Sequence, residues 1–412
     1  MFSELIQLWR VRPTRDYLTL SAIFQMGMSF VGTLYFLYLK QAGLTDTQAL
    51  SVNAIYFATS LILEVPTGIF ADKYGRKLSI NLGYFIFTLG IACYAFGQSY
   101  FWFALAELLA AIGSAFLSGA LDTWLKSELS GSETELALLN QAISKKWFIV
   151  NGIGVPFMVL SPIIAAEFSF QTSYWTAAVI LGLTFIYSLS LNRAKYKEEH
   201  RQSGVELAIS AWNFFWSRPN IINLTVFSVG MNLVCAPLFM FWQTIFQSNG
   251  EIQLNQIGFV LVTFKLSMML GNWIQERLAK IIHLKFDEEA EHAIFIQLYK
   301  HSLVIIACCV LLSLWSLNQS TWLAILFFAL FEVVIGIQMP LFDKVVIQSI
   351  DSQAATSIRS LISVFNKFGY MVGLILAGPL SDAYGQKFTW LLAGIGLLAF
   401  WLALQFTKLK QP

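Results

Sequence analysis

The most regular feature of this sequence is a series of long apolar stretches separated by short polar ones. Each stretch is about 20 residues long, which is the length that an α-helix needs to cross the hydrocarbon core of a bilayer. The stretches lack the two-residue alternation of a membrane-spanning β-strand, so the pattern predicts helices. Twelve transmembrane helices are expected, at residues 17–40, 48–70, 78–97, 101–124, 146–166, 171–191, 219–245, 254–277, 300–317, 321–342, 357–380 and 389–407.

The longest polar stretch, residues 192–218, lies between the sixth and seventh predicted spans. It divides the chain into an N-terminal six-helix bundle (1–191), a linker (192–218) and a C-terminal six-helix bundle (219–412). We therefore expect an all-α membrane protein built from two six-helix bundles. The linker segment with Trp212, Phe215 and Trp216 is interpreted either as an amphipathic helix at the inner membrane surface or as an early start of the seventh span.

The basic residues are distributed unequally between the two sides of this topology. If residue 1 is placed in the cytoplasm, only Lys40 and Lys387 fall in outer loops, and Lys265 falls inside the eighth span. All other lysines and arginines then lie on the inner side. Because short cytoplasmic loops carry the excess of basic residues, this pattern predicts a plasma (inner) membrane protein with both termini in the cytoplasm.

The composition supports the same class of protein. Hydrophobic residues make up 57% of the chain and charged residues only 12%, whereas a soluble domain carries about 25% charged residues. This balance excludes an ordinary soluble enzyme and a disordered tail. The net charge of +2 indicates no nucleic-acid partner. A monomer is the simple expectation, because one chain holds a complete set of spans.

The sequence contains no motif of an enzyme, a metal site or a nucleotide site. No G-x-x-x-x-G-K-[ST] loop is present, and the four histidines form no H-x-x-x-H or H-E-x-x-H pair. The acidic stretch 287–292 is interpreted as a solvated inner loop rather than a metal site. We expect no enzymatic activity, no metal and no cofactor, so that any transport would draw its energy from an ion gradient, with the proton gradient as the default.

The loop between the second and third spans reads Gly68-Ile-Phe-Ala-Asp72-Lys-Tyr-Gly75-Arg76-Lys77. It resembles the signature loop of the major facilitator superfamily, G-x-x-x-D-[RK]-x-G-R-[RK]. The position of the loop, the twelve spans and the division into six and six agree with that family. The resemblance implies two bundles that rock around a central site and expose it to each side of the membrane in turn.

Each residue of this loop has a physical reason to be there. Gly68 allows close helix packing, Gly75 permits a tight turn, and Asp72 can accept hydrogen bonds from the start of a helix in the other half. The fourth span returns Asp122 to the same side, so a network of Asp72, Arg76 and Asp122 is expected. By the resemblance, these residues and Lys77 form a cytoplasmic gate; alternatively, Arg76 and Lys77 only fix the topology.

Four ionisable residues stand well inside predicted spans, where each costs about 2.5–3.5 kcal/mol to insert: Glu64, Glu107, Lys265 and Glu332. Lys265 and Glu332 lie at similar depth, so we expect them to pair. This pair would be either a proton or substrate switch or a fixed structural ion pair. The resemblance places the tenth span, and with it Glu332, on the central cavity.

The other two acidic residues leave alternatives open. Glu107 either faces a site lined by small residues or extends toward the outer interface. Glu64, close to Pro66 and Gly68, carries protons or extends the gate network. Uncharged polar residues inside spans are interpreted as helix-packing residues or as cavity residues, and these are Gln25, Asn232, Gln243 and Gln338.

The direction of transport is predicted from weaker signals. Drug-efflux members of the family carry G-P-x-x-G-G late in the fifth span, whereas here the sequence is Ser161-Pro-Ile-Ile-Ala-Ala166. Small residues are kept but every glycine is replaced, so this element weakens the prediction of efflux without cancelling it. The stretch from Glu64 to Lys77 looks most like bacterial efflux-type members. We therefore expect proton-coupled efflux, by antiport, of a small and partly apolar compound. The alternatives are proton-coupled uptake and facilitated diffusion of a small metabolite; a membrane enzyme or a receptor is disfavoured.

Overall fold

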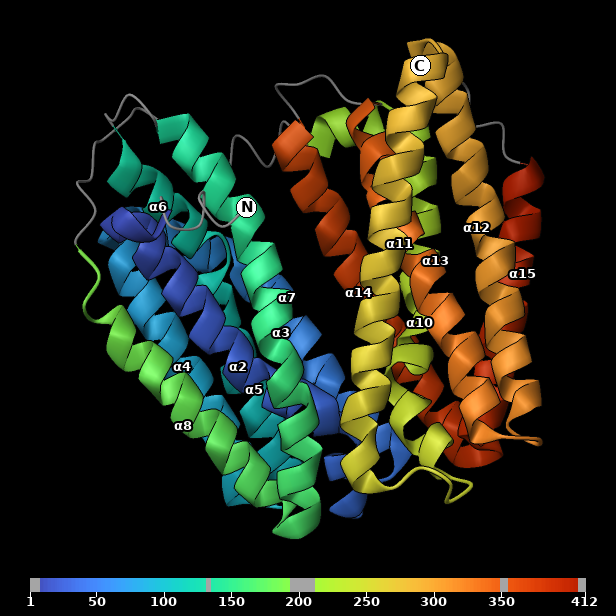
Figure 1. Ribbon diagram of the computed structural model, residues 1–412, viewed down its shortest axis with the longest axis horizontal. Helices are drawn as coiled ribbons and strands as arrows, with labels where there is room; N and C mark the ends of the chain where they lie inside the picture. The colour runs from blue at the N-terminus through green and yellow to red at the C-terminus, as the bar shows by residue number, and fades with distance from the viewer. Residues whose placement is uncertain (1–7, 131–134, 193–211, 349–354, 407–412) are drawn as a thin grey trace. The chain divides into compact units, whose positions relative to one another are not determined.

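The computed structural model describes residues 8–130, 135–192, 212–348 and 355–406 (Figure 1). These residues form helices and contain no strand. Eleven of the described helical segments are long and apolar enough to cross a membrane. Helix α8 (Phe170–Ser188) stands where the sixth span is predicted, and its first turns carry polar residues such as Gln171 and Thr172. The predicted all-α fold is confirmed.

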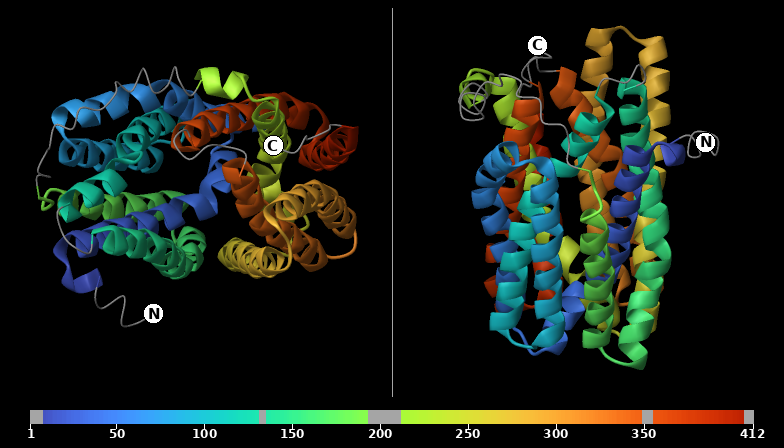
Figure 2. Two further views of the ribbon diagram at one scale, coloured as in Figure 1. Left: turned by 90° about the horizontal axis from the view of Figure 1, so that it is seen from above. Right: turned by 90° about the vertical axis from the view of Figure 1, so that its left-hand side faces the viewer.

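The chain forms two compact units, seen from the side in Figure 1 and from two further directions in Figure 2. Unit 1 contains residues up to Leu44, residues 55–200 and a short segment, Leu254–Phe259. Unit 2 contains Thr45–Ala54 and the rest of the chain from Arg201. Each unit therefore includes one short segment that the sequence order would assign to the other half.

Unit 1 is built from helices that pack along their length. Its helices are α2 (Arg12–Gln41), most of α3 (Asp46–Tyr74), α4 (Arg76–Phe96), α5 (Tyr100–Leu117), α6 (Ala120–Leu129), α7 (Glu135–Glu167) and α8. The most extensive packing joins α4 to α5 and α2 to α7. Helices α4 and α5 approach closely because Gly90 and Gly113 leave no space for a side chain: a Cβ atom on Gly113 would lie 2.6 Å from the backbone nitrogen of Phe87.

Unit 2 repeats this construction. Its helices are α10 (Pro219–Gln247), most of α11 (Ile257–Lys285) after a 3-10 turn at Leu254–Gln256, α12 (Glu288–Ser316), α13 (Thr321–Gln348), α14 (Ala355–Tyr384) and α15 (Gln386–Phe406). The most extensive packing joins α12 to α13 and α10 to α14. The indole Nε1 of the buried Trp390 donates a hydrogen bond to the Pro237 carbonyl, at 3.1 Å, and so ties α15 to α10.

The fourth predicted span is broken in the structure. Helix α5 ends at Leu117, Gly119 adopts a left-handed conformation with φ of 65°, and the short helix α6 continues from Ala120. Thr67 and Ser79 donate side-chain hydrogen bonds to carbonyls of the last turn of α5. In an unbroken helix, these carbonyls would accept hydrogen bonds from backbone amides of the next turn. Because the Thr67 and Ser79 side chains satisfy them instead, the break is compatible with a membrane interior.

Two segments differ from the sequence prediction. Helix α12 begins at Glu288, so residues predicted as a solvated loop form the first turns of a helix, with Asp287 capping it by accepting from the Ala290 amide at 2.8 Å. Residues 193–211 of the linker lie outside the described residues. In its last part, Phe215 is buried in the core of unit 2 beside Phe365, whereas Trp212 and Trp216 are exposed. Phe215 is therefore a core residue rather than a surface anchor.

Candidate functional site

The signature loop occupies the turn from α3 to α4. Gly75 has a φ of 97° and stands directly before the first residue of α4. Asp72 and Arg76 form a side-chain hydrogen bond and ion pair across this turn. The side chain of Asp72 is 54% exposed, and Gly68 has no atom within 4 Å of where its Cβ would be. The predicted contact between Asp72 and Arg76 is present.

Asp122 does not complete the expected network with Arg76. Its carboxylate instead accepts hydrogen bonds from the Tyr17 hydroxyl at 2.7 Å and from the Lys146 ammonium at 3.1 Å. The ammonium of Lys146 also lies 5.0 Å from the centre of the Tyr17 ring, within cation–π range. The prediction was wrong at Asp122 because it assumed one straight helix, whereas the break at Gly119 places Asp122 on the separate helix α6.

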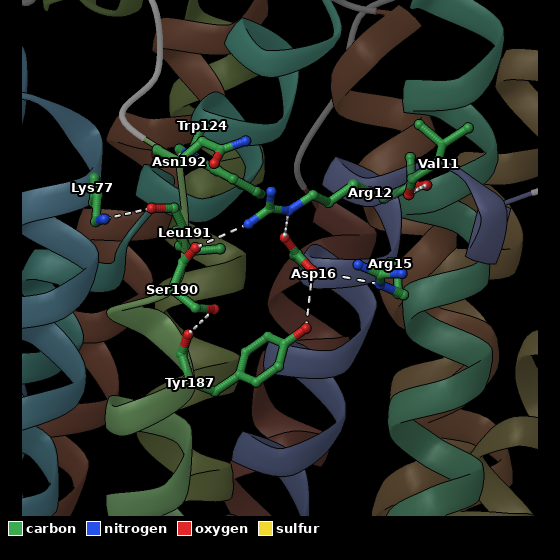
Figure 3. A network of polar contacts seen from close by, with 11 residues as sticks. Val11, Arg12, Arg15, Asp16, Lys77, Trp124, Tyr187, Ser190, Leu191 and Asn192 are labelled. Carbon is green, nitrogen blue, oxygen red and sulfur yellow. Dashed lines mark hydrogen bonds and ion pairs between the residues drawn. The ribbon is translucent and has the colours of Figure 1, made fainter.

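Lys77 ties the signature loop to the end of α8. Its ammonium donates a hydrogen bond to the Leu191 carbonyl, just beyond α8 (Figure 3). The indole of Trp124 donates to the neighbouring Asn192 carbonyl at 3.3 Å. A positive charge is favourable beside the carbonyls at the end of a helix. Lys77 thus has a structural partner within unit 1.

A second charged network on the same side centres on Asp16, which the sequence interpretation missed. Asp16 is buried, accepts a hydrogen bond from the Tyr187 hydroxyl at 2.9 Å, and pairs with Arg12 at 3.6 Å and Arg15 at 3.7 Å (Figure 3). Arg12 also donates to the Ser190 carbonyl at 3.5 Å. The four-residue spacing of Arg12 and Asp16 is the signal that could have revealed this network.

In unit 2, Glu332 is a buried carboxylate near the middle of α13 and is 8% exposed. Lys265 on α11 is an exposed residue. Within the described residues, however, no ion pair or hydrogen bond joins the two side chains. The expectation of a direct Lys265–Glu332 ion pair was therefore wrong.

The depth of these two residues is fixed by a close crossing of α11 and α13. A Cβ atom on Gly271 would lie 2.0 Å from the Val333 carbonyl oxygen, and one on Gly336 would lie 2.2 Å from the Met268 carbonyl oxygen. The helices can approach this closely because neither glycine has a side chain. Lys265 and Glu332 lie one to two turns away from this crossing on their own helices, so they share a level.

Glu107 lies inside unit 1 and does not extend to the outer interface. It is 5% exposed and accepts a hydrogen bond from the Tyr94 hydroxyl at 2.7 Å. The rings of Tyr94 and Tyr174 are in contact, with centroids 5.3 Å apart, and the Tyr38 hydroxyl donates to the Tyr94 carbonyl at 2.8 Å. Of the two predicted alternatives, the interfacial one is wrong. Glu107 is held within an aromatic core.

The remaining predicted residues are spread over several helices. Glu64 on α3 is half-buried. Gln25 donates to Ser29 at 3.3 Å, Asn232 donates to the Ser228 carbonyl at 2.8 Å, and the Gln338 amide lies 4.0 Å from the Met231 sulfur. Gln243 is buried. The hydrogen bonds of Gln25 and Asn232 lie within their own helices, so they are not the bonds between helices that a packing role predicts.

Glu291, at the start of α12, was also missed. It is buried and accepts hydrogen bonds from the Lys344 ammonium at 2.6 Å and from His283 Nδ1 at 2.9 Å. The Lys344 ammonium lies 4.1 Å from the centre of the Phe295 ring. The hydrogen bond from Lys344, followed by that from His283, lowers the pKa of Glu291 below the usual 4.5. The described residues contain no group of three metal-ligating side chains.

Comparison with known proteins places these features in context. The family model of the Major Facilitator Superfamily matches residues 17–374. The uncharacterized MFS-type transporter YxaM of Bacillus subtilis is 20% identical over 236 residues, which are 57% of this chain and 59% of that protein. The quinolone resistance protein NorA of Staphylococcus aureus is 25% identical over 178 residues, 42% of this chain and 43% of that protein.

The matched part of this chain thus spans less than two thirds of the length of these curated relatives. Among solved structures, the nucleoside transporter NupG superposes with a TM-score of 0.77 at 14% identity, covering 97% of this chain and 100% of that one. A bacterial homologue of the lysosomal transporter Spinster superposes with a TM-score of 0.72 at 12% identity, covering 96% and 97%. At such identities the likeness concerns the fold alone.

Proposed function

The chain belongs to the Major Facilitator Superfamily of membrane transporters, and from that premise we propose that it exports a small, partly apolar compound in exchange for protons. The observation that carries this proposal is the buried carboxylate of Glu332 in the middle of α13. A carboxyl group in an apolar membrane site can take up a proton in one state of the protein and release it in another, as its solvation changes.

The apolar surroundings of Glu332 also suit a partly apolar compound. Phe331 is fully buried beside it on α13 and contacts Phe328 and Phe239, with ring centroids 4.7 and 5.9 Å away. The export direction is supported by the similarity to a quinolone resistance protein, because removal of a drug from the cell is one basis of resistance. A quinolone is therefore the first compound to test.

Glu107 supplies a matched comparison for Glu332. Both are buried glutamates, one in each unit, but the carboxylate of Glu107 accepts a hydrogen bond from Tyr94 within an aromatic core. A glutamine at position 107 keeps an oxygen that can accept this hydrogen bond. Replacement of Glu107 is therefore expected to preserve proton coupling, whereas the same replacement at Glu332 removes the group that takes up the proton.

The test uses purified protein in liposomes that contain a pH-sensitive dye, with a gradient of a fluoroquinolone across the membrane. Protons are expected to move opposite to the compound in the native protein and in Glu107→Gln, and this movement is lost in Glu332→Gln. Protons that move with the compound would instead indicate uptake by symport. Compound transport without any proton signal would contradict coupling and indicate a facilitator.

We further propose that the protein works as a monomer in the plasma (inner) membrane, with both termini in the cytoplasm. In this orientation, the turn between α3 and α4, with Gly68, Asp72, Gly75, Arg76 and Lys77, faces the cytoplasm and acts in the gate. The exposure of Asp72 and the open space beside Gly68 leave this turn accessible to a partner helix. No enzymatic activity, metal or cofactor forms part of the proposal.

A further inference from the structure

The turn between α14 and α15 repeats the signature loop. It reads Gly378-Pro-Leu-Ser-Asp382-Ala-Tyr-Gly385-Gln386-Lys387. The glycine, aspartate, tyrosine, glycine and lysine stand at the same spacing as in the turn between α3 and α4. We call the turn from Gly68 to Lys77 the first copy and the turn from Gly378 to Lys387 the second copy.

The two copies share their backbone conformation as well as their spacing. Gly385 has a φ of 89° and Gly75 a φ of 97°, and each stands directly before the first residue of a helix. The amide of each glycine donates to the carbonyl four residues earlier, at 2.7 Å for Gly385 and 3.1 Å for Gly75. Glycine is needed at both positions because other residues rarely adopt such a φ. The second copy is therefore a structural repeat.

The second copy holds the start of α3. The carboxylate of Asp382 accepts hydrogen bonds from the backbone amides of Asp46 at 2.8 Å and Thr47 at 3.1 Å. A Cβ atom on Gly378 would lie 2.7 Å from the Thr47 Cα, so the backbones touch at this glycine. These residues all belong to unit 2, which includes Thr45–Ala54. A carboxylate at this position satisfies free amides and complements the positive end of the helix dipole.

The side chain of Asp46 strengthens the same contact. It is buried and accepts hydrogen bonds from the Ser381 hydroxyl at 2.6 Å and from the Gln386 amide at 3.0 and 3.1 Å. The amide oxygen of Gln386 in turn accepts from the Thr244 hydroxyl of α10 at 2.5 Å. Each polar group of Gln386 thus has a partner, and α3 is joined to both α14 and α10.

The first copy offers the same groups without a comparable partner in the described residues. Asp72 bonds to Arg76 of its own turn and is exposed, and Gly68 faces open space. Asp46 begins α3 and Asp72 lies near its end. The two copies therefore lie at opposite ends of one long helix, and the second copy is bound to its start.

One difference in sequence between the two copies fits the side of the membrane on which each copy is expected to lie. Gln386 stands where the first copy has Arg76. Basic residues are disfavoured on the outer side of a membrane protein, and a glutamine keeps the donor without the charge. Unlike arginine, it also provides an acceptor for Thr244.

We propose that Asp46, Ser381, Asp382 and Gln386 form a reversible outer latch, which binds the start of α3 in one state of the transport cycle and releases it in the other. This inference rests on the proposed function only in that it assumes alternating access. Asp382 is exposed, and its hydrogen bond with the Thr47 amide lies at an exposed site where water competes for it. Contacts of this kind are weak enough to break in each cycle.

The latch can be tested by the accessibility of Ala49, which is fully buried one turn into α3. A cysteine is placed at position 49 in a background whose native cysteines are replaced by alanine, and a polar maleimide is applied to the purified protein in detergent. Asp382→Ala removes the cap of α3 and is expected to raise the labelling rate about fivefold, as the loss of a helix cap predicts. Gln386→Arg pairs a cation with Asp46 and is expected to lower the labelling rate.

The matched control is Glu251→Ala. Glu251 accepts from the Thr321 amide at the start of α13, at 2.9 Å, and so caps a different helix of unit 2. This change should leave the labelling of position 49 within about twofold of the parent, because the helix cap that it removes is not that of α3. Unchanged labelling in Asp382→Ala, equal labelling increases in both alanine variants, or faster labelling in Gln386→Arg would overturn the latch.

The labelling experiment uses neither substrate nor proton gradient. A protein that moves no protons but shows the expected labelling pattern would contradict the proposed function and support the latch. Proton-coupled transport, together with a labelling rate at position 49 that the variants do not change, would support the proposed function and overturn the latch. If Asp382→Ala does not fold, as judged by gel filtration and thermal melting, Gln386→Arg decides the question alone because it adds a contact.

Discussion

At the scale of single residues, Glu291 shows how a charge in a polar stretch becomes part of the core. It lies among acidic neighbours, yet Lys344 and His283 surround its carboxylate at hydrogen-bond distance. Glu276, one helix earlier, is chemically the same residue but pairs with Lys280 at the exposed surface. Burial and partners, rather than residue type, separate a structural charge from a solvated one.

This difference predicts how Glu291→Gln changes stability. The substitution should destabilise the protein by about 1–3 kcal/mol at neutral pH, because Lys344 loses its charged partner inside the core. Because the pKa of Glu291 is lowered in the folded protein, its contribution is complete above the usual carboxyl pKa of 4.5 and disappears as the pH falls through the lowered pKa. Thermal melting in detergent across this pH range measures the effect.

Glu276→Gln is the matched control for that measurement. It removes an exposed pair and should leave the melting temperature nearly unchanged. An equal loss in both variants would show that the buried contacts of Glu291 carry no special stability. If the melting temperature of Glu291→Gln fell with decreasing pH as much as that of the native protein, Glu291 would not be the source of the loss of stability in acid.

At the scale of elements, the packing of α11 against α13 sets the level of Glu332. Gly271 and Gly336 face each other's backbones at distances that exclude a Cβ atom. The observed role of Gly271 is therefore close packing against α13. A helix crossing of this kind positions residues several turns away, because both helices are rigid over that length.

Gly271→Ala should therefore force the two helices apart. We expect a loss of about 1–3 kcal/mol in stability, since the added methyl group meets backbone that cannot move aside, together with slower proton-coupled transport. Gly152→Ala on α7 is the matched control, because a Cβ atom there has no neighbour within 4 Å and should be tolerated. Thermal melting and the liposome assay measure the two effects. Equal changes in melting temperature and transport rate in the two variants would argue against the close crossing of α11 and α13.

The broken fourth span is a second feature at this scale. A left-handed glycine, Gly119, separates α5 from α6 and turns Asp122 toward Tyr17 and Lys146. Thr67 and Ser79 bond to carbonyls of the last turn of α5. The break was not predicted because Ser118-Gly119 interrupts no hydrophobic pattern, and glycine within an apolar stretch is also common in unbroken membrane helices.

At the scale of the whole molecule, the distribution of basic residues predicts the orientation in the membrane. Lys387 should face the outside and Lys126 the cytoplasm, and both side chains are exposed. In intact cells, an impermeant thiol reagent is expected to label Lys387→Cys and not Lys126→Cys, with both labelled after the cells are opened. The reverse pattern would contradict the orientation on which the gate and the outer latch depend.

The sequence alone determined the class of protein, its all-helical fold and the family resemblance. These follow from local properties: the length of apolar stretches, the side on which lysine and arginine fall, and the spacing of the loop from Gly68 to Lys77. The contact of Asp72 with Arg76 was also predictable, because residues four apart at a helix end are neighbours whatever surrounds them.

Only the tertiary structure decided which distant charges meet. It paired Asp122 with Tyr17 and Lys146, kept Lys265 from direct contact with Glu332, and brought Asp382 to the start of α3. The physical reason is that such contacts depend on helix breaks, crossing distances and side-chain direction, which shift a charged group by several ångströms without changing the hydrophobic pattern. A hydrogen bond tolerates far less displacement than that.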